Sequence, residues 1–134
     1  MAAEKKVADA SVIVKLFVHE EHSDIAIDLL QKHSKGEVLL IVPELLFLEV
    51  LNALRYKHQD KEALVKVNKQ LWELQFRVER LNSFLLAQAS AIALEKNLSI
   101  YDAVYVALAQ NFGVPLITAD KALKNISNAV FLGV

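Results

Sequence analysis

The sequence contains no cysteine, only three glycines and two prolines, and no long run of apolar residues. Without cysteine there can be no disulfide framework, no cysteine-ligated zinc or iron–sulfur centre and no thiol nucleophile. The longest unbroken apolar run is seven residues, Ala103 to Ala109, against the ~20 that a membrane-spanning helix needs. The apolar stretch after Ser11 is broken at Lys15, too soon for a secretory signal. We therefore expect a cytoplasmic protein that is neither secreted nor inserted in a membrane.

No excess of either charge is present, because 15 Lys and Arg face 16 Asp and Glu, for a formal net charge of −1. Proteins that bind nucleic acid through bulk electrostatics are strongly basic, so any contact with nucleic acid must be local. The best local candidate is the segment 55–70, where five basic residues outnumber Asp60 and Glu62: Arg55, Lys57, Lys61, Lys66 and Lys69. A solvated helical face is the ordinary explanation of such a segment.

Hydrophobic patterning predicts one domain, residues 1–134, whose 54% of hydrophobic residues suffice for a full core. Strands are expected at 6–9, 38–42, 76–81, 114–118 and 129–132. Helices are expected at 11–18, 23–33, 43–57, with Pro43 in the first turn, 61–74, 83–96 and 99–112, and a short one from Asp120. This alternation predicts an α/β fold of three layers, α/β/α, with a central, mostly parallel sheet of about five strands.

Four acidic residues lie at positions that a catalytic role explains better than a role in keeping the surface soluble. Asp9 follows the first predicted strand and Asp120 follows the fourth, at the edge of a parallel sheet where ligands bind. Glu49 and Asp102 occupy the largely apolar helical segments PELLFLEVLNAL and SIYDAVYVALA. Helix capping is the ordinary explanation of Asp102 or Asp120 taken alone. It does not explain Glu49, because an unpaired buried carboxylate costs several kcal/mol.

If these four acids converge, they need a cation. Two carboxylates ~5 Å apart repel by ~3 kcal/mol at an effective dielectric constant near ~20. A divalent ion removes this repulsion, and oxygen ligands without His or Cys select Mg²⁺ or Mn²⁺ over Zn²⁺. Such an ion can activate water to hydrolyse a phosphodiester. Ser11 and Thr118, each two residues from an acid, can hold a carboxylate or a metal-bound water, and Asn52 extends a polar stripe from Glu49.

Several short motifs together resemble the PIN-domain nucleases, most closely the small VapC-type toxins. They are ADAS at 8–11, the Glu of an apolar helix about forty residues on, YDAVYVALA at 101–109 and TAD at 118–120. The resemblance covers the whole chain and implies a PIN-like fold. It also implies a Mg²⁺- or Mn²⁺-dependent ribonuclease whose catalytic, metal-binding acids correspond to Asp9, Glu49, Asp102 and Asp120. RNA as substrate, a homodimer and a small VapB-type antitoxin as partner follow from the same resemblance.

Two other enzyme classes share this architecture and fit less well. Haloacid-dehalogenase-type phosphatases need an Asp two residues after the nucleophilic Asp, where this chain has Ser11. Receiver domains need an Asp after the third strand, where the nearest candidate is Asn82. A non-catalytic PIN-like domain that binds RNA or a partner is an alternative that intact acids do not exclude.

Two further groups of residues favour structural roles. His19-Glu20-Glu21-His22 resembles a zinc-protease motif, but its histidines are three residues apart where the motif needs four. We expect the three tyrosines in the core or an interface rather than stacked on bases: Tyr56, Tyr101 and Tyr105.

Overall fold

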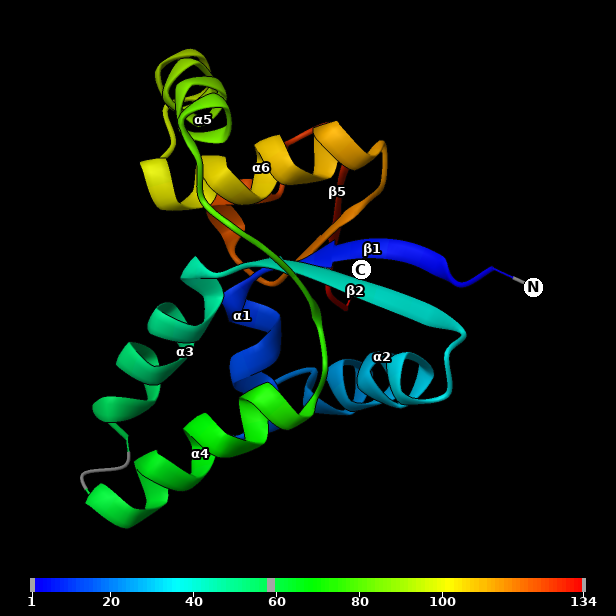
Figure 1. Ribbon diagram of the computed structural model, residues 1–134, viewed down its shortest axis with the longest axis vertical. Helices are drawn as coiled ribbons and strands as arrows, with labels where there is room; N and C mark the ends of the chain where they lie inside the picture. The colour runs from blue at the N-terminus through cyan, green and yellow to red at the C-terminus, as the bar shows by residue number, and fades with distance from the viewer. Residues whose placement is uncertain (1, 58–59, 134) are drawn as a thin grey trace.

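The fold is centred on a five-stranded parallel sheet in the computed structural model, which describes residues 2–57 and 60–133 (Figure 1). The strands are β1 (Glu4–Ala8), β2 (Val38–Pro43), β3 (Arg77–Glu79), β4 (Leu116–Thr118) and β5 (Ala129–Phe131). Their order is β3-β2-β1-β4-β5, and all four pairings are parallel. The predicted α/β class is confirmed, with a sheet that is wholly rather than mostly parallel in the described ranges.

Helices cover both faces of this sheet (Figure 1). On one face lie α1 (Ala10–Ile13), the 3-10 turn η1 (Val14–Leu16), α2 (Ser23–Ser34), α3 (Leu45–Arg55) and α4 (Lys61–Glu73). On the other lie α5 (Ser83–Lys96) and α6 (Ile100–Phe112), and a second 3-10 turn, η2 (Lys121–Leu123), joins β4 to β5. The predicted three-layer α/β/α arrangement is confirmed. Among the residues described, none of the helices has both the length and the apolar character needed to cross a bilayer.

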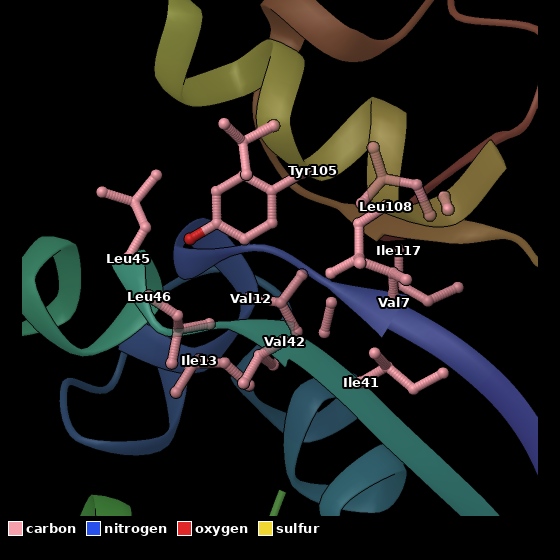
Figure 2. Packing of buried hydrophobic residues seen from close by; sticks show 14 of the residues in the cluster. Val7, Val12, Ile13, Ile41, Val42, Leu45, Leu46, Tyr105, Leu108 and Ile117 are labelled. Atoms are coloured by element: carbon pink, nitrogen blue, oxygen red, sulfur yellow. The ribbon is translucent and has the colours of Figure 1, made fainter. Parts of the chain in front are cut away.

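The core lies on both faces of the central strands (Figure 2). Val7 and Ile41, in β1 and β2, are fully buried between the helical layers. The apolar run 103–109 of α6 is buried along its whole length, because this helix lies between the sheet and α5. Ile13 and Leu46 fill the opposite face from α1 and α3.

The sequence predicts Pro43 in the first turn of a helix, and this prediction is wrong. Pro43 is the last residue of β2, where it pairs with Glu79, and α3 begins at Leu45. Pairing of β2 with β1 has already stopped at Ile41, so the missing N–H of the proline breaks no ladder with β1.

Other element ends also differ from the prediction. The helix expected over 11–18 is a single turn of α-helix followed by a 3-10 turn, in a segment rich in β-branched residues. β3 is shorter than 76–81, β4 starts after Pro115, and β1 ends at Ala8, one residue before Asp9. None of these differences moves an acid away from the carboxyl edge of the sheet.

Candidate active site

Asp9 occupies the point where the strand order reverses. From β1 the chain proceeds to β2 and β3 on one side, and β4 and β5 lie on the other. Asp9 follows β1 directly, and its backbone N–H donates to the carbonyl of Ile117 in β4 at 3.2 Å. Its carboxylate caps α1 by accepting from the backbone N–H of Val12 at 3.4 Å. The side chain is only 4% exposed, at the place where open parallel sheets bind their ligands.

Two hydroxyl groups hold the Asp9 carboxylate from opposite sides. Ser11 Oγ donates to Oδ1 at 2.5 Å, and Thr118 Oγ1 donates to Oδ2. Each hydroxyl in turn accepts from a backbone N–H of the turn after β4: Ala119 N lies 2.9 Å from Ser11 Oγ, and Asp120 N lies 3.0 Å from Thr118 Oγ1. Both hydroxyl residues named from the sequence therefore contact Asp9, and they fix the end of β1 to the turn after β4.

Asp120 and Asp102 approach from two further elements. Asp120 caps η2, since its Oδ1 accepts from the backbone N–H of Ala122 at 2.9 Å. Asp102 lies in the first turn of α6 and is not the cap, because Ser99 Oγ accepts from its backbone N–H at 3.0 Å. The carboxylate of Asp102 therefore does not cap α6. Helix capping, the ordinary explanation of such acids, accounts for Asp120 but not for Asp102.

The carboxylate of Glu49 accepts a hydrogen bond from Tyr105. The Tyr105 hydroxyl donates to Glu49 Oε1 at 2.7 Å, and the tyrosine is 1% exposed. Its ring is part of the core, as expected, and its oxygen points toward α3 (Figure 2). Sequence reasoning did not find this contact. The available signal was a tyrosine one helical turn after Asp102 in an apolar segment, because a buried tyrosine hydroxyl needs an acceptor.

Three of the four carboxyl groups, those of Asp9, Glu49 and Asp102, have a raised pKa. Burial raises the pKa of Asp9 to about 6, aided by the charge of Asp120 and opposed by the hydrogen bonds from Ser11, Thr118 and Val12. Burial and the charges of Asp102 and Asp120 raise the pKa of Glu49, against the Tyr105 hydrogen bond. Burial and Asp120 also raise the pKa of Asp102. These four acids therefore share one electrostatic site, in which full ionisation without a cation is unfavourable.

The chemistry of the donors fits a hard divalent cation. Within 2–57 and 60–133, no three His, Asp or Glu side chains already form a group tight enough to hold a metal ion. The four acids nonetheless supply only carboxylate oxygens, which suit Mg²⁺ or Mn²⁺, and their mutual repulsion would be relieved by positive charge. Asn52 is exposed on α3 and makes no hydrogen bond to the four acids in the described part of the chain, so the structure does not bring it into this group.

A pocket of about 410 Å³ opens beside these acids, between α1–η1 and α3. Ser11, Glu49 and Ala119 line it together with Ala10, Val14, Lys15, Glu20, Ala53 and Lys57. Glu20 comes from the His-Glu-Glu-His segment and forms salt bridges with Lys15 and Lys57. Of the four acids only Glu49 lines this pocket, which it shares with Lys15 and Lys57. Sequence reasoning missed Lys15 as a site residue and placed Lys57 only in a broad basic segment.

Comparison with known proteins shows clear relatives. A family model described as the PIN domain matches residues 6–129. Ribonuclease VapC3 of Pyrobaculum aerophilum is 35% identical over 126 residues, which cover 89% of this chain and 92% of that protein.

Solved structures share the fold. A toxin–antitoxin complex from Klebsiella pneumoniae contains a chain that superposes with a TM-score of 0.70 at 18% identity, covering 93% of this chain and 95% of that one. PAE2754 from Pyrobaculum aerophilum gives a TM-score of 0.68 at 22% identity, covering 98% and 91%. At these identities the two structures show that the α/β/α architecture is shared.

Proposed function

The chain belongs to the PIN-domain family, and from that membership we propose that it is a VapC-type ribonuclease, the toxin of a toxin–antitoxin pair. It hydrolyses RNA phosphodiester bonds, and its active site consists of four acids: Asp9, Glu49, Asp102 and Asp120. One observation supports the assignment of the site: the four acids come from four separate elements and lie close enough, at the point where the strand order reverses, for the charge of Asp120 to raise the pKa of the other three. The 35% identity to Ribonuclease VapC3 supports the choice of RNA as substrate.

A Mg²⁺ or Mn²⁺ ion held by these four acids would supply a more acidic bound water and neutralise charge that develops on the phosphate. The protein's own residues orient the reacting groups. Ser11 and Thr118 fix both carboxylate oxygens of Asp9. The Tyr105 hydroxyl donates to Oε1 of Glu49 and fixes the orientation of this carboxylate, which leaves Oε2 for the cation.

Cleavage of a labelled single-stranded RNA by the purified protein tests this proposal. We expect cleavage with Mg²⁺ or Mn²⁺ and none with EDTA, and products that carry a 5′-phosphate and a 3′-hydroxyl, because water rather than the ribose 2′-hydroxyl attacks. Asp102→Asn is the matched inactive variant. Cleavage that survives EDTA, or products with a 2′,3′-cyclic phosphate, would contradict the mechanism. RNA binding without any cleavage would favour the non-catalytic alternative.

The proposal includes a VapB-type antitoxin as partner. The solved structure from Klebsiella pneumoniae is described as a toxin–antitoxin complex. A site of four carboxylates is best blocked by a cation, so we expect the antitoxin to place an Arg or Lys near Asp9 and Asp102. Recovery of a small DNA-binding protein with this chain from its native host supports the toxin assignment. Its absence would contradict that assignment while leaving the nuclease activity to be judged separately.

A homodimer in the cytoplasm completes the proposal. Large apolar side chains are exposed on α5, where Phe84 is 74% and Leu94 is 88% exposed. Such side chains favour burial against another protein surface. Light scattering of the purified chain should give twice the mass of 15.0 kDa, and a monomer at all concentrations would contradict the dimer.

A further inference from the structure

Two lysines share a single glutamate at the end of the pocket away from the acids. Lys15 Nζ lies 3.2 Å from Glu20 Oε1, and Lys57 Nζ lies 3.4 Å from Glu20 Oε2. Lys15 Nζ also donates to the backbone carbonyl of Glu21 at 2.7 Å. Burial disfavours the charged form of Glu20, but hydrogen bonds and charges from both lysines outweigh it and hold its pKa below the ordinary value. The cluster of Lys15, Glu20 and Lys57 therefore carries one unneutralised positive charge.

The pocket leads from Glu49 directly to this cluster. Glu49, Ala53 and Lys57 are spaced by four residues, so they follow one side of α3 and its C-terminal turn. The backbone N–H of Lys57 still donates to the carbonyl of Leu54 at 3.0 Å, just beyond the last helical residue. A rise of ~1.5 Å per residue puts Lys57 ~12 Å along the axis from Glu49. Ser11 and Lys15 line the opposite wall from α1 and η1.

We propose that Lys15 and Lys57 bind a backbone phosphate of the RNA that neighbours the scissile phosphate. This inference rests on the proposed ribonuclease function. Four carboxylates and one divalent ion leave a net charge of −2 at the acids, and the whole chain has a formal charge of −1. RNA must overcome this repulsion to reach the site, and two ammonium groups in the same pocket offer a phosphate both hydrogen bonds and positive charge.

A salt-bridge brace is the competing explanation, because Glu20 also connects the turn before α2 to the end of α3. The two explanations make different predictions for Glu20. If the cluster only braces the fold, removing Glu20 loosens the pocket, and RNA binding gains no more than the small general effect of one lost negative charge. If the cluster binds phosphate, Glu20 competes with RNA for the lysines, so its removal strengthens binding.

The experiment measures binding of a labelled single-stranded RNA by fluorescence anisotropy between 50 and 200 mM salt. All variants carry Asp102→Asn, so that Mg²⁺ can be present without cleavage. One phosphate contact to a single strand contributes ~0.7 to the slope of log K against log salt, equivalent to about five-fold in affinity at ~0.1 M salt. Lys57→Gln should therefore weaken binding about five-fold and reduce the slope by ~0.7, whereas Glu20→Gln should tighten binding.

Lys69→Gln is the matched control, because Lys69 is 78% exposed on α4 and pairs with Glu73 only at 3.9 Å. Its affinity should equal that of the parent protein. The test changes Lys57 and Glu20 rather than Lys15, because the Lys15 side chain is only 10% exposed and its loss endangers the local fold. Urea unfolding of each variant checks that the fold is retained.

The inference is overturned if Lys57→Gln binds like Lys69→Gln, or if Glu20→Gln binds RNA more weakly than its parent. Its failure is separable from failure of the proposed function. If the wild type cleaves RNA with Mn²⁺ and Lys57→Gln binds RNA normally, the ribonuclease function stands and the phosphate site is wrong. If the wild type never cleaves RNA but the affinities change as expected, the phosphate site stands and the ribonuclease function is wrong.

Discussion

Replacing Asp9 by asparagine should stabilise the metal-free protein while abolishing its activity. Burial raises the pKa of Asp9 from its ordinary value of 3.8 to about 6. A difference of about two pKa units corresponds to about 3 kcal/mol by which ionised Asp9 destabilises the fold at pH 7.5. Asparagine has no charge to bury, but its NH₂ group must face one of the two hydroxyls that now donate to the carboxylate, at a cost of about 1 kcal/mol. We therefore expect a net gain of about 2 kcal/mol in the free energy of unfolding.

The gain should depend on pH with a definite sign. Because the folded-state pKa of Asp9 lies above the unfolded one, protonation of Asp9 stabilises the fold. This contribution is complete below pH ~4 and is lost as the pH rises through about 6. Lowering the pH from 7.5 to 5 should therefore raise the free energy of unfolding of the wild type by about 1.4 kcal/mol through Asp9, an increase that Asp9→Asn cannot show. Glu49 and Asp102 are present in both proteins, so the difference between the two curves isolates Asp9.

Urea unfolding at both pH values, with EDTA throughout, measures these differences. Asp28→Asn is a suitable control, because Asp28 is 61% exposed on α2, where it pairs with Lys32. It should change the free energy of unfolding by less than about 0.5 kcal/mol. In a parallel thermal melt, Mn²⁺ should raise the melting temperature of the wild type much more than that of Asp9→Asn.

The opposite pattern would refute this reasoning. An Asp9→Asn protein that unfolds more easily than the wild type at pH 7.5, by an amount independent of pH, would identify the Asp9 carboxylate as a stabilising acceptor for Ser11, Thr118 and Val12. If Mn²⁺ also shifted neither protein, Asp9 would be a structural residue and the candidate site would be wrong.

Three further predictions test the site and the fold. Tyr105→Phe should lower RNA cleavage about ten-fold and reduce the rise in melting temperature caused by Mn²⁺, because Glu49 loses the hydrogen bond that orients it. If neither cleavage nor the rise in melting temperature changes, Tyr105 does not position Glu49. Leu46→Ala, at a fully buried position, should cost ~2 to 5 kcal/mol in urea unfolding, whereas Leu48→Ala, at a position 70% exposed, should cost less than ~0.5, and equal losses would contradict the packing described. Gly113→Ala should cost about 1 kcal/mol, since Gly113 ends α6 with a φ of +64° that disfavours any side chain; a stabilised variant would show that α6 ends differently.

Local chemistry made most of the fold predictable from the sequence. The largely β-branched run of β2 specifies a buried strand, and Ser99 and Asn82 supply the local caps that begin α6 and α5. Pro43 misled the prediction because proline suits both the first turn of a helix and a strand end. The deciding fact, that pairing with β1 stops two residues earlier, is a tertiary one.

The acids of the candidate site were predictable for a different reason. Asp9 and Asp120 follow strands, and a parallel sheet gathers the carboxyl ends of its strands at one edge. Contacts between residues distant in the chain carry no such local signal. The hydrogen bond from Tyr105 to Glu49 spans 56 positions, and the pairing of Lys57 with Glu20 spans 37. These contacts depend on how helices pack across the sheet, which no spacing rule encodes.

The hydrogen bond from Thr118 to Asp9, which spans 109 positions, also has a consequence in time. A ribosome adds ~5 to 20 residues per second, and a growing chain has β1, β2 and β3 long before β4 exists. Until β4 is made, Asp9 lacks its Thr118 partner and Asp120 is absent, so the four acids cannot assemble. Under the proposed mechanism, a nascent chain of this protein cannot cleave RNA for most of its synthesis, and a chain truncated before Thr118 never acquires the activity.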